Sequence, residues 1–318
     1  MLTRPRVPLR IAFTSKGNPS VIAAVLWSFL MVAVSSTADA ATTLVVDDDG
    51  FAAVNDCDAA TATFMSISTA VAAASPGDTI QVCPGTYVEN IPLAKKLTLE
   101  GAQAGVDARG RVASESQVTP LVAATPTLTL FTGSAGSIID GFTFLAGTRA
   151  IVSDTGPIDG LQIRNNRIQG FTGNGLFLDD NGINITISKN DIDGTAKLGA
   201  GDLVHLDQDN FDGLWFTDNR VANGLTATGF FVDGTRNVDQ GAAGSRKPEF
   251  TGNLIERNLT GVNLGRLAWG DGPISGNIIR HNLSDGLQGG PKNSTIEDNW
   301  FHNNGRNGLG LTSFGNTT

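Results

Sequence analysis

The sequence predicts an all-β fold of the parallel β-helix type, mainly because a short motif repeats along the chain. The motif is an apolar residue, two variable residues, Asn, one variable residue and a second apolar residue. It occurs at Asn166, Asn190, Asn219, Asn253, Asn277 and Asn299, in steps of 24, 29, 34, 24 and 22 residues. A period of this length is typical of a solenoid.

Each of these asparagines is followed, eight to eleven residues later, by a glycine and a short apolar strand. No 3.6-residue periodicity lies between them, which excludes helical solenoids. A leucine-rich repeat needs a fixed leucine frame, whereas Ile, Phe, Val and Leu alternate here. In a parallel β-helix each coil adds one rung to every sheet, and inward Asn side chains can hydrogen-bond along the stack. We therefore interpret the Asn column as structural.

The first 40 residues are typical of a secretory signal peptide. Four basic residues precede an apolar run from Val21 to Val34, and Ala38-Asp39-Ala40 is a small-x-small cleavage pattern. An uncleaved membrane anchor is the alternative, but the run is shorter than the roughly 20 residues of a spanning helix. We expect a mature protein that is soluble, free of the membrane, and secreted to the periplasm or the exterior.

The mature chain is acidic, since removing residues 1–40 leaves 18 basic and 30 acidic residues and a net charge of −12. This charge disfavours nucleic acid and anionic membranes as partners. A polyanionic substrate would need local basic residues or a bridging cation.

The only two cysteines, Cys57 and Cys83, lie near the start of the mature chain. In an exported protein they predict a disulfide. A catalytic thiol is the alternative, but none of the three histidines lies near either cysteine in the sequence.

A short amphipathic helix is expected over Phe64 to Ala74, followed by a strand over 79–83, a turn at Pro84-Gly85-Thr86 and a strand over 97–99. Such a helix would cover the open first coil of a solenoid. We assign residues 41–96 to an N-terminal cap with the first strands, and residues 97–318 to the repeats.

Three segments carry a family resemblance: DDDG at 47–50, FMSISTAVAAASPGDTIQVCPGTYVENI at 64–91 and KKLTLEGA at 95–102. They resemble the entry into right-handed parallel β-helix proteins of the pectin-lyase-like superfamily. That superfamily includes polysaccharide lyases, glycoside hydrolases, uronan epimerases, pectin esterases, phage tailspikes and noncatalytic surface proteins. The resemblance implies the fold and leaves the reaction open. No GHG or RIK follows the Asp179-Asp180 pair, and DLVHLDQD at 202–209 only loosely matches the DPHD pattern of mannuronan epimerases.

The alternation of inward and outward residues aligns the strands that follow each glycine. The alignment gives two outward columns: Asp179, Asp207 and Asp233 in one, and Phe177, His205, Phe231 and Asn263 in the other. A slip of one residue would turn His205 inward. A separate alternative is that the aspartates only mark where each strand ends, since Asp is common there.

Stacked carboxylates repel one another, and two arrangements would relieve the repulsion. The first is a bound Ca²⁺, held by Asp179, Asp207 and Asp233 with Asp180 and Asp209 nearby. The second is a division into a proton-bearing acid and an ionised partner, as glycosidic chemistry requires.

With Ca²⁺, the expected reaction is β-elimination on a uronate. The catalytic residues would be His205 as base together with the aspartate column, and Arg266 would bind the uronate. Phe177, Phe231 and Asn263 would line the sugar-binding surface. The sequence therefore predicts a secreted protein acting on an acidic polysaccharide, as a lyase or related enzyme. The alternative is a noncatalytic glycan-binding or surface-structural module.

Two further features leave alternatives open. The connection from Gly234 to Lys247 either walls a groove or is a tolerated insertion. The last coil, at Leu309-Gly310-Leu311, has no amphipathic cap. It predicts either a fragment of a longer chain or self-association through this coil.

Overall fold

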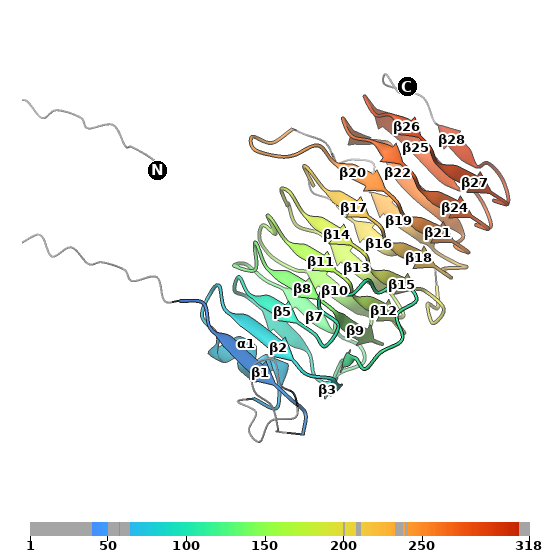
Figure 1. The fold of residues 1–318 in the computed structure, drawn as a ribbon. Helices are drawn as coiled ribbons and strands as arrows, with labels where there is room; N and C mark the ends of the chain where they lie inside the picture. The colour runs from blue at the N-terminus through green and yellow to red at the C-terminus, as the bar shows by residue number, and fades with distance from the viewer. Residues whose placement is uncertain are drawn as a thin grey trace, which may run out of the picture. The chain divides into compact units, whose positions relative to one another are not determined.

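The computed structural model is a right-handed parallel β-helix, which confirms the predicted fold class (Figure 1). It describes residues 40–49, 57, 64–199, 201–207, 211–232, 238 and 241–311, without the side chains of residues 266–268. Within this part of the chain the strands form three parallel sheets, and each full coil gives one strand to each sheet in turn.

Sheet 1 contains ten strands of the described chain, and each pairs with the strand one coil away. They are β1 (Thr43–Val46), β2 (Thr79–Val82), β5 (Thr98–Glu100), β8 (Ile138–Asp140), β11 (Gln162–Arg164), β14 (Thr186–Ser188), β17 (Trp215–Thr217), β20 (Glu249–Thr251), β23 (Ile274–Ser275) and β26 (Ile296–Glu297).

Sheet 2 follows sheet 1 in every coil. Its strands are β3 (Gly85–Val88), β6 (Ser116–Thr119), β9 (Phe142–Leu145), β12 (Arg167–Gln169), β15 (Asp191–Asp193), β18 (Arg220–Ala222), β21 (Leu254–Glu256), β24 (Ile278–Arg280) and β27 (Trp300–His302).

Sheet 3 completes the coil. Its strands are β4 (Ile91–Leu93), β7 (Leu128–Leu130), β10 (Arg149–Ser153), β13 (Asn174–Leu178), β16 (Asp202–Leu206), β19 (Thr228–Val232), β22 (Thr260–Gly270), β25 (Leu287–Lys292) and β28 (Leu309–Leu311).

The core fills the inside of the coil. At each inward position of a strand, the apolar side chains of successive coils stack into a column. On sheet 3 the column Leu176, Val204, Phe230 and Val262 is completely buried. Alternate residues of a strand point to opposite faces, so the residue on either side of each inward residue lies on the outer face. The core thus fixes which side chains each coil offers to solvent.

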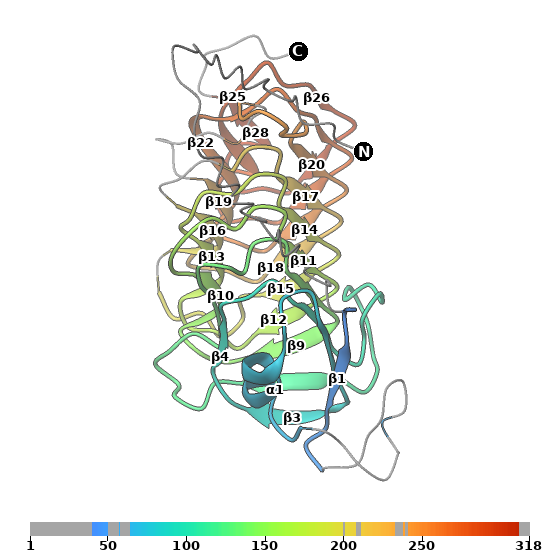
Figure 2. The same ribbon diagram turned by 90° about the vertical axis from the view of Figure 1, so that its left-hand side faces the viewer.

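The predicted cap helix is confirmed with shorter bounds, as α1 (Ile67–Ala73), at the N-terminal end of the coil (Figure 2). Ser66 is its N-cap, and the Glu89 carboxylate accepts hydrogen bonds from the backbone N–H groups of Ile67 and Ser68. Lys95 donates to carbonyls of the last turn, including that of Ala74 at 2.7 Å. These contacts satisfy backbone groups that a helix leaves open at its ends.

The predicted turn at Pro84-Gly85-Thr86 is wrong, because β3 begins at Gly85. This strand pairs with β6 over the register Gly85 to Ser116, and Tyr87 points into the core with 3% exposure. A Pro-Gly pair usually marks a turn. Here it marks the corner between sheets 1 and 2, and the new strand starts immediately after it.

The Asn column is a continuous hydrogen-bond ladder at the corner between sheets 1 and 2. Asn166 Oδ1 accepts the backbone N–H of Phe142, and from Asn190 onward the Oδ1 of each asparagine accepts the backbone N–H of the asparagine one coil earlier, as from Asn190 to Asn219 at 3.0 Å. Its Nδ2 group donates to a sheet 1 carbonyl of that earlier coil, as from Asn219 to Ile187 at 2.9 Å. The residue before the asparagine has a positive φ, 57° at Asp218, which turns the corner. The structural interpretation of this column is confirmed.

A second ladder, which the sequence prediction missed, lies at the corner between sheets 2 and 3. Asn258, Asn282 and Asn304 repeat the same pattern, with Asn258 N–H donating to Asn282 Oδ1 at 3.0 Å. Their preceding residues also have positive φ, 55° at both Arg257 and His281. The dipeptides Arg-Asn, His-Asn and Asn-Asn at regular spacing were the available signal.

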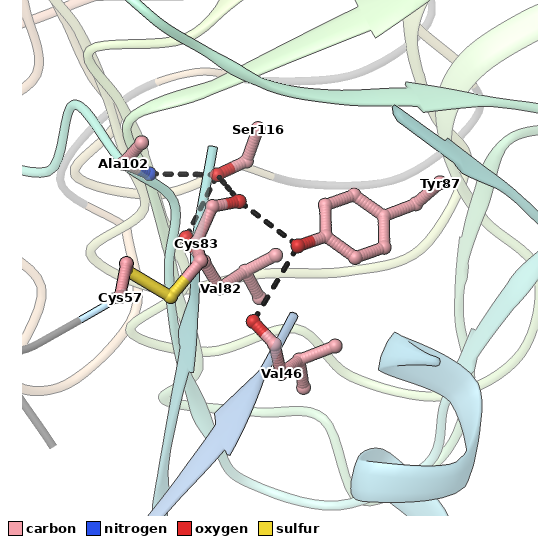
Figure 3. Close-up of a disulfide and its surroundings, with 7 residues drawn as sticks. All are labelled: Val46, Cys57, Val82, Cys83, Tyr87, Ala102 and Ser116. Atoms are coloured by element: carbon pink, nitrogen blue, oxygen red, sulfur yellow. Dashed lines mark hydrogen bonds between the residues drawn. A yellow bond between two sulfur atoms is a disulfide. The ribbon is translucent and has the colours of Figure 1, made fainter. Parts of the chain in front are cut away.

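The predicted disulfide is present, and it joins Cys57 to Cys83 at the end of β2 (Figure 3). The Tyr87 hydroxyl donates to the Cys83 carbonyl at 2.9 Å, and Ser116 Oγ lies 2.8 Å from the same oxygen. Burial is the main cause that raises the pKa of Tyr87, so the hydroxyl remains a donor. The disulfide therefore joins Cys57 to the corner between sheets 1 and 2, where buried hydrogen bonds already hold Cys83.

Parts of two predictions, the signal peptide and the uncapped last coil, fall outside the described residues. Residues 1–39 of the predicted signal peptide are among them, and in the described chain no helix is long and apolar enough to cross a membrane. In the last described coil Trp300, Leu309 and Leu311 are 55%, 39% and 43% exposed. Residues 312–318 are not described, so self-association through this coil stays a prediction.

Replacing Asn219 with Ala should lower the free energy of unfolding by roughly 3 kcal/mol or more, because buried groups of Asn190 and Ile187 lose their partners. Thermal unfolding followed by circular dichroism measures this. The matched control is Asn299→Ala at the half-exposed end of the ladder, where water can replace the lost bonds. Equal losses in the two variants would contradict the burial argument.

Replacing both cysteines with serine should cost roughly 3–4 kcal/mol, because the bridge closes a loop with a sequence separation of 26. The midpoint of thermal unfolding with and without a reducing agent tests this. Reduction should lower the midpoint of the parent and leave the double-serine variant unchanged. An insensitive parent would show that the bridge does not stabilise the fold.

Candidate functional site

The two columns predicted on the strands after each glycine lie on the outer face of sheet 3. Phe177 pairs in register with His205, His205 with Phe231, and Phe231 with Asn263. His205 does not turn inward, because Val204 and Leu206 on either side of it fill the core. The predicted register of the His205 coil is therefore correct.

The His205 imidazole lies between two phenylalanine rings. Its ring centroid is 5.2 Å from that of Phe177 and 4.9 Å from that of Phe231, and the second pair meets edge to face. These are distances at which aromatic rings attract one another. The side chain of His205 is 19% exposed, so the stack leaves a small part of the imidazole accessible to solvent.

Asp202, three residues before the histidine, holds the other side of the imidazole. Its Oδ2 lies 2.7 Å from His205 Nδ1, and the Asp202 residue is only 8% exposed. Its backbone carbonyl accepts a hydrogen bond from the Asn174 side chain at 2.8 Å. A buried carboxylate on Nδ1 fixes the proton there and leaves Nε2 as the acceptor nitrogen.

Lys197, in the connection between β15 and β16, is buried at 9% exposure and donates to the carbonyl of Gly173. Burial lowers the pKa of its ammonium group, while attraction to Asp202 works in the opposite direction. The Lys197 ammonium group is thus close enough to Asp202 for the two charges to attract each other.

His205 Nε2 has no hydrogen-bond partner and is buried. It faces Asp207 Oδ1 at 3.7 Å, which is beyond hydrogen-bonding distance. Asp207 lies just after β16, and its side chain is 19% exposed. Two acceptor atoms that face each other could share one added proton after Asp207 moves closer by a few tenths of an ångström or more. A buried polar atom without a partner calls for an explanation of this kind.

The aspartate column is described only in part. Asp179 and Asp207 lie just past β13 and β16, and the backbone N–H of Asp207 donates to the Leu178 carbonyl at 2.9 Å. Asp179 therefore stands one coil before Asp207, as predicted. The third member of the column, Asp233, lies outside the described residues.

The predicted calcium site stays a prediction. No cluster of three or more His, Cys, Asp or Glu in the described chain is placed to hold a metal ion. Of the five predicted ligands, Asp179, Asp180 and Asp207 belong to that part, whereas Asp209 and Asp233 do not.

The sugar contacts predicted for Asn263 and Arg266 both stay predictions, and the structure describes the two residues to different extents. Asn263 lies in the outward column after Phe231, and its Oδ1 accepts the backbone N–H of Gly265 at 3.0 Å. Arg266 lies on β22, where the pairing register with β25 shifts, and its side chain is not described. The uronate contact predicted for Arg266 therefore stays a prediction.

Sequence reasoning missed Arg149, Asp202 and Lys197. Arg149, at the start of β10, places its guanidinium carbon 3.7 Å from the centroid of the Phe177 ring. The three residues stand at strand starts or in corners, where strand alternation does not predict the direction of a side chain. The available signal was the spacing of Asp202 and His205 within DLVHLDQD.

The connection from Gly234 to Lys247 is held at two described points. Val238 forms a bridge to Trp269 in β22, and both residues are completely buried. Arg246 lies 3.6 Å over the ring of Trp215 and donates to the Ile185 carbonyl at 2.7 Å, next to sheet 1. Neither contact lies against the outer His205 column.

Comparison with solved structures supports the architecture. A pectate lyase, Pel9A, is 15% identical with a TM-score of 0.55, over 87% of this chain and 78% of its own. An A-module of the mannuronan C-5 epimerase AlgE6 from Azotobacter vinelandii is 14% identical with a TM-score of 0.47, over 77% and 73%. At such identities the likeness to the lyase shows the fold alone, and the likeness to the epimerase carries no argument.

Comparisons of sequence give one clear result. No curated protein matches the chain. A family model described as "Protein of unknown function (DUF1565)" matches residues 54–305, which is most of the chain. The chain therefore belongs to this family.

Proposed function

We propose that this protein binds an acidic polysaccharide along the outer face of sheet 3 and acts on it as a lyase or a related uronate-active enzyme. The observation that carries the proposal is His205, held by Asp202 on one nitrogen and without a hydrogen-bond partner on the other. The fold shared with a pectate lyase supports the substrate class. The disulfide supports our further proposal that the protein is secreted.

The aromatic column provides a surface for sugar rings. Phe177 and Phe231 flank His205 on successive coils, so a glycan lying along the column would contact all three. Coils repeat at roughly 4.8 Å, close to the length of one sugar unit. Such a surface binds a sugar ring through apolar contact area, while polar groups at its edges fix the orientation of the sugar.

The proposed reaction uses His205 and Asp207 as one proton-accepting pair. The proton on C5 of a uronate passes to the pair, the electrons of the C–H bond form the C4–C5 double bond, and the C4–O bond breaks. The leaving oxygen takes a proton from the pair or from water. Once Nε2 holds the proton, Asp207 can move closer to accept a hydrogen bond from it, and Asp202 stabilises the charged imidazole from the other side.

The alternative function is a noncatalytic glycan-binding module. One observation favours it, namely that Nε2 is buried in the free protein and Asp207 must move or relay the proton. The aromatic column would bind a glycan equally well without chemistry. Binding to an acidic polysaccharide without any product would therefore select this alternative.

The parent chain should release unsaturated uronate from pectate, alginate or a glycosaminoglycan, detected by its ultraviolet absorbance. His205→Ala and Asp207→Ala should each reduce the rate by about a hundredfold or more, since a positioned proton acceptor typically contributes that much. His302→Ala, which removes a histidine from the outer end of sheet 2, is the control and should keep the parent rate. Full activity in His205→Ala would remove this residue from the mechanism.

Calcium should raise the thermal midpoint of the parent by several degrees if the aspartate column binds the ion, since a ligand that binds only the folded state stabilises it. Asp207→Ala should abolish the shift, whereas Asp193→Ala on sheet 2 should keep it. A midpoint that does not respond to Ca²⁺ would rule out the metal-assisted version and leave the metal-free reaction in place.

A further inference from the structure

Arg149 differs from most arginines of the described chain because it has no acidic partner. Ion pairs are formed there by Arg109, Arg111, Arg164, Arg220, Arg257, Arg280 and Arg306. Arg246 instead donates to backbone carbonyls. Within the described residues, no carboxylate lies within 4.0 Å of the Arg149 guanidinium, and its contact is the face of the Phe177 ring.

This contact leaves the hydrogen-bonding edge of the guanidinium available. The guanidinium carbon lies 3.7 Å from the Phe177 ring centroid, so the aromatic ring occupies one flat side of the group. The five N–H donors point outward in the plane of the guanidinium, in the fork geometry that matches a carboxylate. Stacking also reduces the freedom of the side chain, which lowers the cost of binding a ligand.

Arg149 lies close to the proposed proton-accepting pair. The Phe177 centroid is 3.7 Å from the guanidinium and 5.2 Å from the His205 centroid, so the two groups are separated by less than two rungs. Consider a uronate whose carboxylate is hydrogen-bonded to Arg149 and whose C5 proton is approached by a base. The distance from the guanidinium to that base, through the carboxylate and C5, is roughly 8–10 Å. One uronate ring over Phe177 can therefore contact both groups.

We propose that Arg149 binds the carboxylate of the uronate whose neighbouring proton is removed at the His205–Asp207 pair. This inference rests on the proposed function and specifies its substrate group. Local positive charge is what a chain with a net charge of −9 needs in order to bind a polyanion. Arg149 selects sugars that carry a carboxylate, while the phenylalanine rings contact any sugar face.

The test measures binding and needs no turnover. Isothermal titration calorimetry would use hexamers of galacturonate and of mannuronate, each with its carboxyl-reduced neutral form, in a His205→Gln background that blocks the reaction. Arg149→Gln is compared in this background with Arg167→Gln. Arg167 is equally half-buried, lies on sheet 2 and also has no ion pair among the described residues, so it matches the charge change.

Arg149→Gln should weaken binding of at least one acidic hexamer about tenfold or more, which corresponds to ~1.4 kcal/mol. Arg167→Gln should change it less than twofold, and neutral hexamers should bind all variants alike. Unchanged affinity in Arg149→Gln would overturn the role of Arg149. If neither the His205→Gln variant nor the parent binds any acidic hexamer, both the proposed function and the role of Arg149 are overturned. Arg149-dependent binding without product in the parent would keep the carboxylate site and reject the lyase.

Discussion

The buried hydrogen bonds of the asparagine ladders are the constraint on which the rest of the structure depends. A corner of a parallel β-helix turns its backbone away from the sheets, and a buried backbone N–H without a partner costs about as much as several favourable contacts supply. Each asparagine satisfies the N–H of the coil before it and returns a hydrogen bond to that coil. The ladder therefore fixes how far one coil is displaced from the next. Together with the in-register pairing of the strands, this displacement keeps a column on the outer face in line.

Most of the fold is visible in the sequence because its signals repeat. The motif around Asn166 and its five successors, the glycine-led strands and the two cysteines all predicted features that the structure contains. The turn at Pro84-Gly85-Thr86 was wrong because local turn chemistry does not distinguish a hairpin from a solenoid corner. The ladder at Asn258 was missed because it covers only the last three full coils, too few to form a pattern.

The candidate site is predictable only where it follows the alternation of a strand. Phe177, His205 and Phe231 are at central strand positions, so their direction follows from the buried residues beside them. Arg149 and Asp202 lie at the first residue of their strands, where the backbone has just turned. Their side chains reach the site through stacking and a hydrogen bond, and these contacts have no periodicity to read.

The place of β16 within sheet 3 has a consequence for how this molecule withstands damage. It is the fifth of nine strands in the described sheet, with four on either side. In a solenoid each coil contacts only its neighbours, so loss of order begins at the ends and moves inward. Proteases or heat would remove several coils before reaching His205. The strands on either side of β16 thus shield the outer face that carries His205, so that loss of order at either end of the sheet can leave this face folded.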